Sequence, residues 1–224
     1  MSGEITTHEQ WLAERKRGIG ASECSAIVGM NPYMSSLELW KLKTGRKEAE
    51  DISSKPHVAY GHAAEPLLRE LFALDYADRF EVSYGGEFDV VRHPDKPYIF
   101  ATLDGRLVEI ETGRCGILEI KTTEILRSMQ REKWQSDDGP CIPDNYFCQV
   151  CWQLLATGWD FAVLHAQLKR DYGGGDIRAE RRSYFVERAD VADDIEYLYA
   201  EGVKFWEEYV QTDREPPLVL PPIF

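Results

Sequence analysis

The pattern of apolar residues changes near residue 78, and this change constrains the fold more than any other feature. The preceding stretch, residues 58–77, carries an apolar stripe at helical spacing, made by Leu67, Leu68, Leu71, Phe72 and Leu74. The chain then continues as short apolar segments separated by turn residues, at 79–84, 87–91, 98–103, 106–110 and 116–121. A helical segment at 145–157 and a hairpin of 159–169 with 180–187 follow. Helices before and within a series of strands predict an α/β domain with a central mixed β-sheet flanked by helices.

The length of 224 residues favours one domain. Its predicted parts are a helical N-terminal part at about 8–77, a sheet core at about 79–187, and a C-terminal helix with a Pro-rich tail at about 188–224. Locally, we expect a kink or a restart at Pro66, a helix over 122–133, and Ser22 as the N-cap of a short helix that Gly29 ends. No apolar run approaches the ~18 residues of a membrane span, and the first residues lack the pattern of a secretory signal, so a soluble intracellular protein is expected.

The charge balance excludes one way of binding nucleic acid. Lys and Arg total 26 against 39 Asp and Glu, a net charge of −13. A protein that coats DNA by bulk attraction needs an excess of cations, whereas an enzyme with a locally basic groove does not. The five cysteines, an odd number, favour reduced thiols, and we interpret Cys148 and Cys151 as buried apolar residues in a helix rather than as a metal or redox site.

The residues most suggestive of chemistry lie between 98 and 121. Asp104 ends one apolar strand, and Glu119 and Lys121 lie in a strand that follows. Because side chains alternate along a strand, Glu119 and Lys121 share a face, roughly 6.6 Å apart at ~3.3 Å per residue. If Asp104 lies on a neighbouring strand, two carboxylates and an ammonium converge, and an all-oxygen site of this kind suits Mg²⁺ or Mn²⁺ and phosphodiester hydrolysis. The alternative is a solvated ion pair on a surface strand.

Several further segments carry a resemblance to a known family. In chain order they are Trp11 and Arg15 with Gly18-Ile19-Gly20-Ala21-Ser22-Glu23, then Gly61-His62-Ala63-Ala64-Glu65-Pro66, Leu103-Asp104-Gly105, Leu118-Glu119-Ile120-Lys121 and Tyr146-Phe147-Cys148-Gln149-Val150. Together they resemble the motifs of the lambda-type phage exonucleases, also called YqaJ-like viral recombinases, within the restriction-endonuclease-like PD-(D/E)xK nuclease superfamily. The sequence departs from the pattern at Leu103, where the family usually has Pro, and at Gln153, where related nucleases often carry Tyr.

The resemblance implies a role for each matching residue. Asp104 and Glu119 would be metal ligands, with the Ile120 carbonyl as a third. Glu65 would support the metal, directly or through water, and Lys121 would position or deprotonate the attacking water. Gln149 would orient Lys121 or the nucleophile, and Arg15 and Ser22 would bind the 5′-phosphate. The plain alternatives are a surface charge for Arg15, an N-cap for Ser22, an exposed helix residue for Glu65, and a backbone-bonded amide for Gln149.

The resemblance also implies the activity. We expect a Mg²⁺-dependent (Mn²⁺ is possible) 5′-to-3′ exodeoxyribonuclease that leaves 3′ single-stranded overhangs on linear duplex DNA, acts as a homotrimeric ring beside a single-strand annealing protein, and works in the cytoplasm of a bacterial host after a phage or prophage origin. We expect no zinc and no iron–sulfur cluster, because nothing after Cys151 completes the cysteine set of iron–sulfur relatives. The alternatives are an endonuclease or structure-specific nuclease of the same superfamily, a catalytically silent DNA-end-binding module, and, remotely, a small-molecule metal hydrolase.

Overall fold

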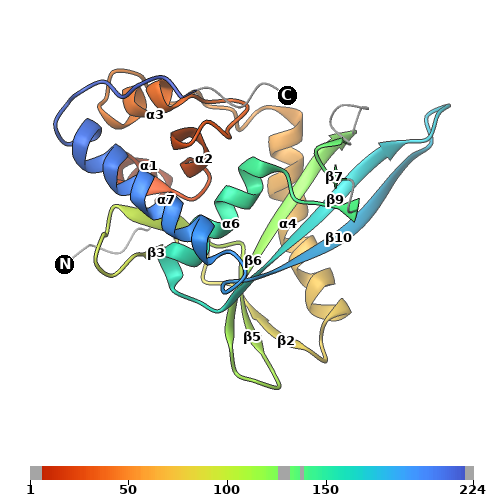
Figure 1. The fold of residues 1–224 in the computed structure, drawn as a ribbon. Coiled ribbons are helices and arrows are strands. Elements are labelled where there is room, and N and C mark those ends of the chain that lie inside the picture. Colours follow the sequence, from red (N-terminus) through yellow and green to blue (C-terminus); the bar gives the residue numbers. More distant parts are fainter. Residues whose placement is uncertain (1–6, 126–131, 137–138, 220–224) are drawn as a thin grey trace.

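The computed structural model describes residues 7–125, 132–136 and 139–219 (Figure 1). Its largest sheet has five strands in the order β10-β9-β6-β5-β2. In chain order these are β2 (Phe80–Ser83), β5 (Gly105–Glu109), β6 (Cys115–Ile125), β9 (Phe161–Asp171) and β10 (Ile177–Glu187). Strands β6 and β9 are parallel and the other neighbours are antiparallel, which confirms the predicted central mixed sheet.

A smaller sheet lies beside the first and connects the N-terminal part of the chain to the strand that precedes Asp104. It consists of β1 (Ile19–Gly20), β4 (Ile99–Thr102) and β3 (Val90–Arg92), with β1 parallel to β4 and β3 antiparallel to it. A two-stranded ribbon of β7 (Gln135–Ser136) and β8 (Gly139–Pro140) precedes helix α6. Residues 137–138, between these two strands, lie outside the described residues.

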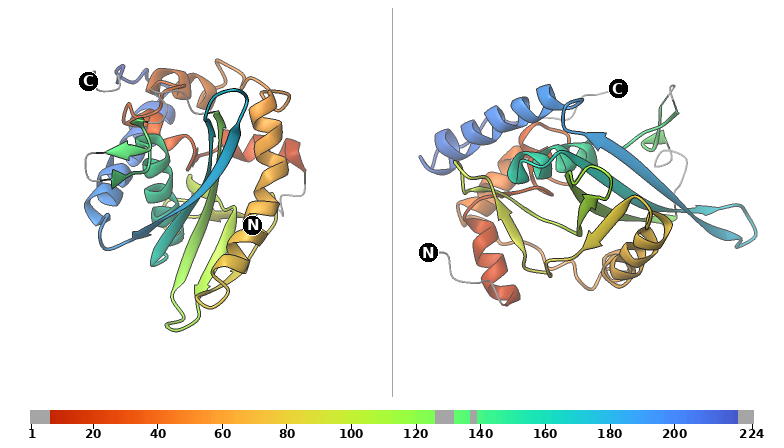
Figure 2. Two further views of the ribbon diagram at one scale, coloured as in Figure 1. Left: turned by 90° about the vertical axis from the view of Figure 1, so that its right-hand side faces the viewer. Right: turned by 90° about the horizontal axis from the view of Figure 1, so that it is seen from below.

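Helices cover both faces of the five-stranded sheet (Figure 2). They are α1 (His8–Lys16), α2 (Cys24–Ile27), α3 (Ser36–Lys43), α4 (Pro56–Asp75), α6 (Asp144–Thr157), α7 (Ala192–Lys204) and a π-helical continuation, η1 (Phe205–Val210). Helix α4 packs on one face through a cluster that includes Leu68, Phe72, Leu118 and Ile120. On the opposite face α6 and α7 pack in the larger core, against strand residues that include Ile117. Neighbouring residues of β6 therefore point to opposite layers, as alternation requires.

Helix α4 runs as one helix through Pro66, so of the two predicted alternatives, a kink or a restart, the restart does not occur. The backbone carbonyl that Pro66 deprives of a partner belongs to His62, an exposed residue. The buried face is also narrower than predicted: Leu68 is buried, but Leu67 and Leu74 are exposed, because α4 forms an outer layer and touches the sheet along a single line.

The predicted helix over 122–133 is wrong at its start. Residues Thr122 to Ile125 extend β6 as strand, and residues 126–131 lie outside the described residues. The extension continues the parallel ladder with β9, where Thr123 Oγ1 accepts from the Lys169 N–H at 3.0 Å and donates to the Gln167 carbonyl at 3.3 Å. Tertiary pairing of β-branched threonines here outweighs the helical pattern.

Several local predictions are confirmed. Strand β9 pairs with β10 as the predicted hairpin. The structure adds a capping box of Ser35 and Glu38 at the start of α3, and Gly158 ends α6 in the left-handed conformation. All five cysteines are free thiols, and Cys148 and Cys151 are buried as predicted. No helix within the described ranges combines the length and apolar character that a bilayer crossing requires.

Candidate active site

Glu119 is the buried centre of a polar cluster between β6 and α6. The residue is 1% exposed, although it carries a carboxylate. Oε1 accepts from Lys121 Nζ at 2.5 Å and from Gln149 Nε2 at 2.6 Å, and Oε2 accepts from Gln153 Nε2. These contacts exclude the alternative of a solvated surface ion pair, because only the Lys121 side chain, 20% exposed, reaches water.

Asp104 joins this cluster from the turn between β4 and β5. Gly105 pairs with Leu118 of β6, and this register places Asp104 Oδ2 where it accepts the Ile120 N–H at 2.8 Å. Burial, and then the negative charge of Glu119, raise the pKa of Asp104 well above its usual value, although Lys121 opposes them. Burial alone would lower the pKa of Lys121, but the charges of Glu119 and Asp104 outweigh it and raise that pKa.

Glu65 approaches Asp104 from helix α4, one turn from Arg69. Arg69 Nη1 donates to Glu65 Oε1 at 3.1 Å and also to the backbone carbonyl of Asp104. The guanidinium lies over the Tyr84 ring, 3.7 Å from its centroid, which fixes its plane. Glu65 is one of the charges that raise the pKa of Asp104. Arg69 therefore connects two residues that the sequence motifs assign to one site.

The donor set fits a hard divalent cation. Three carboxyl side chains, those of Glu65, Asp104 and Glu119, face two cationic side chains, Lys121 and Arg69, so acidic groups outnumber basic ones in this largely buried place. The ligands available are all oxygen, which suits Mg²⁺ or Mn²⁺. Within the described ranges no three Asp, Glu, His or Cys side chains are already arranged around one point, and the Glu65 carboxylate is bonded to Arg69.

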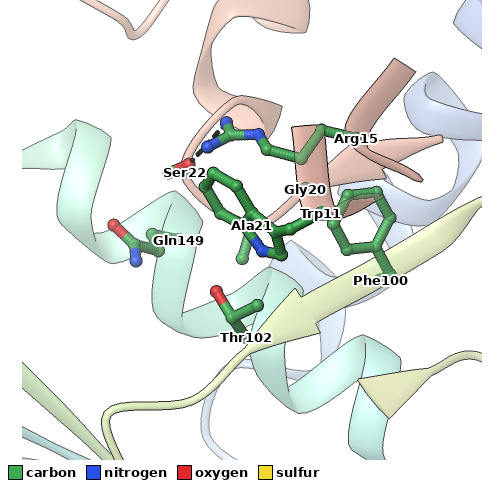
Figure 3. Close-up of a pocket in the computed structure, with 8 residues that line it drawn as sticks. All are labelled: Trp11, Arg15, Gly20, Ala21, Ser22, Phe100, Thr102 and Gln149. Carbon is green, nitrogen blue, oxygen red and sulfur yellow. Dashed lines mark hydrogen bonds between the residues drawn. The ribbon is translucent and has the colours of Figure 1, made fainter. Parts of the chain in front are cut away.

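A small cavity of about 30 Å³ lies beside this cluster (Figure 3). Its lining comes from α1, β1 and the turn after it, β4 and α6: Trp11, Arg15, Gly20, Ala21, Ser22, Phe100, Thr102 and Gln149. Arg15 Nη2 donates to Ser22 Oγ at 3.4 Å, and its guanidinium lies 4.8 Å from the centroid of the Trp11 ring. Gln149 lines the cavity and also bonds Glu119, so one side chain connects the two parts of the site.

The prediction of Ser22 as an N-cap is wrong. Glu23 holds the N-cap position of α2, and no side chain caps that helix, which is only four residues long. Ser22 instead lies in the turn after β1, where its hydroxyl accepts from Arg15.

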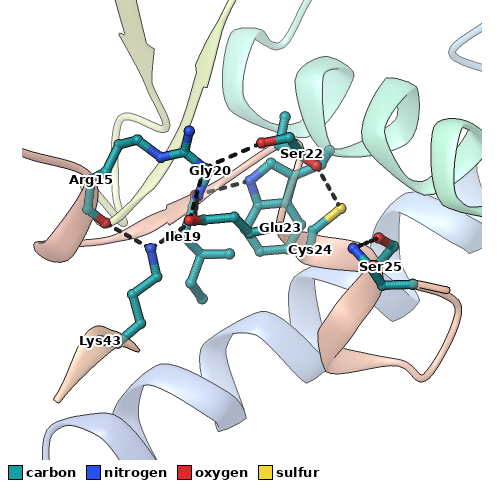
Figure 4. A network of polar contacts seen from close by, with 11 residues as sticks. Arg15, Ile19, Gly20, Ser22, Glu23, Cys24, Ser25 and Lys43 are labelled. Atoms are coloured by element: carbon teal, nitrogen blue, oxygen red, sulfur yellow. Dashed lines mark hydrogen bonds and ion pairs between the residues drawn. The ribbon is translucent and has the colours of Figure 1, made fainter. Parts of the chain in front are cut away.

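A buried ion cluster lies behind the cavity (Figure 4). Glu23 Oε1 accepts from Arg15 Nη2 at 2.9 Å, and Glu23 Oε2 accepts from Lys43 Nζ at 2.6 Å and from the Gly20 N–H at 3.0 Å. Burial alone would raise the pKa of Glu23, but the charges of Lys43 and Arg15, with these hydrogen bonds, lower it to about 2.

The motifs leave the contacts of four residues unpredicted. Gln153 follows Gln149 by four residues and Arg69 follows Glu65 by four, so helical spacing alone places each pair on one face, a signal that the sequence contains. Glu23 lies in the first motif, and the family resemblance implies no role for it. Lys43 carries no signal, because it reaches Glu23 from a different helix, 20 positions away.

The mixed sheet with helices on both faces is an α/β fold of the restriction-endonuclease-like kind, and solved structures share this fold. The alkaline exonuclease from Laribacter hongkongensis has a TM-score of 0.63 at 19% identity, over 92% of this chain and 93% of that one. The same enzyme in complex with dAMP has a TM-score of 0.61 at 18% identity, covering 92% and 94%. A phage-related exonuclease from Haemophilus somnus 129PT has a TM-score of 0.56 at 11% identity, covering 88% and 96%.

A family model for the YqaJ-like viral recombinase domain matches residues 10–160, and this chain belongs to that family. The uncharacterized protein YqaJ of Bacillus subtilis (strain 168) is 28% identical over 212 residues. This match covers 95% of the present chain and 59% of the relative, so the chain spans little more than half of that protein's length.

Proposed function

We propose that this chain is a divalent-metal-dependent 5′-to-3′ exodeoxyribonuclease that shortens one strand of linear duplex DNA and leaves a 3′ overhang. The observation that carries the proposal is the position of Gln149, which lines the cavity beside Arg15 and also bonds Glu119. An anion bound by Arg15 and a phosphodiester beside Lys121 would then lie on opposite sides of the Gln149 side-chain amide. This arrangement suits the terminal phosphate and the next phosphate of one strand.

In the proposed mechanism each side chain has a limited task. Arg15 and Ser22 bind the terminal 5′-phosphate, since Arg offers a planar donor fork. Asp104, Glu119 and the Ile120 carbonyl would hold the cation, with Glu65 supporting it after release from Arg69 or through water. The cation, when bound, would polarise the phosphate and make water a stronger nucleophile at neutral pH. Lys121 orients the attacking water or stabilises the negative charge on the phosphate oxygens, and Gln149 holds Glu119 or the nucleophile in place.

The products follow from which bond breaks. Water attacks the second phosphorus, the bond from phosphorus to the 3′ oxygen of the terminal nucleotide breaks, and that oxygen takes a proton. A nucleoside 5′-monophosphate leaves, and the shortened strand keeps a new 5′-phosphate for Arg15. The related fold solved with dAMP holds a molecule of this chemical class, which supports the assignment.

The assembly and the partners are part of the same proposal. A homotrimeric ring around the duplex would require a basic lining only, which is compatible with a net charge of −13 because the acidic residues would face outward. A single-strand annealing protein would take up the overhang, and a phage or prophage origin would place the reaction in a bacterial cytoplasm. The mass of the particle in solution tests the ring: a monomer that digests processively would contradict it.

The activity is tested by incubating the protein with linear and covalently closed duplex DNA, in Mg²⁺ and in EDTA. The proposal predicts nucleotide release from the linear DNA in Mg²⁺ alone and an intact circle. Cleavage of the circle would indicate an endonuclease of the same fold.

Binding to DNA ends without nucleotide release in Mg²⁺ would favour the second candidate, a catalytically silent end-binding module. The specific observation in its favour is that donors already satisfy both oxygens of Glu119, as in a structural polar network.

A further inference from the structure

Lys43 lies behind the cavity without lining it, and its contacts have no role in the mechanism above. Its side chain is 3% exposed, yet it carries an ammonium group. Nζ donates to Glu23 Oε2 at 2.6 Å and to the backbone carbonyl of Arg15 at 2.7 Å. Lys43 therefore holds both Arg15 itself and the carboxylate that pairs with Arg15.

Glu23 connects the two cations through its two oxygens. Oε2 accepts hydrogen bonds from Lys43 Nζ and the Gly20 N–H, and Oε1 accepts from Arg15 Nη2 (Figure 4). The donors on Oε2 therefore fix the carboxylate plane, and Oε1 faces the guanidinium. Because the pKa of Glu23 is about 2, the carboxylate stays ionised throughout the neutral range.

The charges of this cluster do not cancel. Arg15 and Lys43 are two cations against one anion, so one positive charge remains, and Arg15 alone of the three lines the cavity. Within the described part of the chain, every hydrogen bond that the Arg15 side chain donates comes from Nη2, which leaves Nε and Nη1 for an incoming anion. A guanidinium held from behind, with donors left over, is preorganised for a phosphate.

We infer that Glu23 and Lys43 are positioning residues that hold Arg15 in the geometry for a terminal phosphate, and so determine how strongly the protein prefers 5′-phosphorylated ends. The inference rests on the proposed function for the identity of the anion. It differs from a structural role, because a pair that only stabilised the fold would affect phosphorylated and unphosphorylated ends equally.

The test measures binding in EDTA, where no cleavage is expected, by fluorescence anisotropy with two duplexes that differ only in a 5′-phosphate or a 5′-hydroxyl. We expect wild type to bind the phosphorylated end about tenfold more tightly, the scale of one charge-assisted hydrogen bond. Glu23→Gln and Lys43→Met should each remove most of that ratio. Lys47→Met is the matched control, because Lys47, just after the end of α3, also pairs with a glutamate, Glu38, but on the surface, and it should keep the ratio.

The double variant Glu23→Gln/Lys43→Met separates folding from positioning. It leaves no unpaired buried charge between the two positions, so it should melt closer to wild type than either single variant. We expect it to recover stability without recovering the phosphate preference. Preference at the wild-type ratio in the folded double variant would overturn the inference, as would a wild type that binds both ends equally. Cleavage in Mg²⁺ is scored separately, so an inactive protein with phosphate preference would refute the nuclease and not the positioning.

Discussion

Replacing Gln153 with Met tests how Glu119 is held. Gln153 is 0% exposed and donates to Glu119 Oε2, while its own Oε1 has no hydrogen-bond partner among the described residues. Met has a similar length and no N–H, so it removes this donor and leaves Lys121 and Gln149 on the other oxygen.

The size of the effect follows from the kind of bond that is lost. A hydrogen bond to a charged group contributes about 1.5–3 kcal/mol, which corresponds to roughly 10- to 150-fold in an equilibrium constant. Loss of a group that orients a metal ligand typically weakens metal binding by about 10–100-fold. We therefore expect the Mg²⁺ dissociation constant to rise by about 10–100-fold. The free energy of unfolding should change less, because Met also removes the buried unpartnered carbonyl, itself a cost of about 1–3 kcal/mol.

Isothermal titration calorimetry with Mg²⁺ compares wild type, Gln153→Met and Leu155→Ala. Leu155 is buried on the same helix, and its truncation should cost about 2–5 kcal/mol of stability without touching Glu119. The folded Leu155→Ala protein should keep the wild-type affinity. Equal Mg²⁺ affinity in wild type and Gln153→Met would refute the reasoning, since Glu119 would then need no donor on Oε2.

Three further changes probe other parts of the structure. Burial and the charge of Glu119 raise the pKa of Asp104, so the metal-free protein should lose stability as the pH rises through that pKa. In EDTA the melting temperature of Asp104→Asn should decline less with pH than that of wild type, and parallel plots of melting temperature against pH would contradict this reasoning. Burial, with the charge of Arg181, lowers the pKa of His165 from 6.5 to about 4, so up to ~3 kcal/mol of the free energy of unfolding should be lost as the pH falls across that interval. Urea unfolding at pH 7 and pH 5 should show this loss in wild type and not in His165→Gln. A Cβ on Gly202 would clash with the Trp152 ring, so Gly202→Ala should destabilise by about 1–3 kcal/mol despite a gain of about 1 kcal/mol in helix propensity. A variant that chemical denaturation finds more stable than wild type would contradict this clash.

Local sequence signals predict much of the architecture. The alternation within residues 116–121 places Glu119 and Lys121 on one face, and the turn at Asp104-Gly105 brings the second carboxylate to the same strand, as the hydrogen bond from the Ile120 N–H to Asp104 demonstrates. These predictions succeed because each depends on residues within a strand, or on strands joined by a short turn.

The errors and omissions concern contacts between distant segments. Thr122 is strand rather than helix because β9, about 45 residues later, continues the ladder to it. Lys43 gives no local sign of its burial, because its partner Glu23 belongs to another helix. Gln153 differs, because its spacing from Gln149 places it beside Glu119 once Gln149 is known to point there.

The most direct test of the account is the initial rate of nucleotide release from linear duplex DNA in Mg²⁺ by Asp104→Asn beside wild type. The substitution keeps the size of the side chain and removes the carboxylate that would hold the cation. We predict a rate at least about 1,000-fold below wild type, with the variant still folded, since a cation that activates water supplies several kcal/mol of the rate. A folded variant that releases nucleotides within about tenfold of the wild-type rate would contradict hydrolysis at a cation held by Asp104 and Glu119.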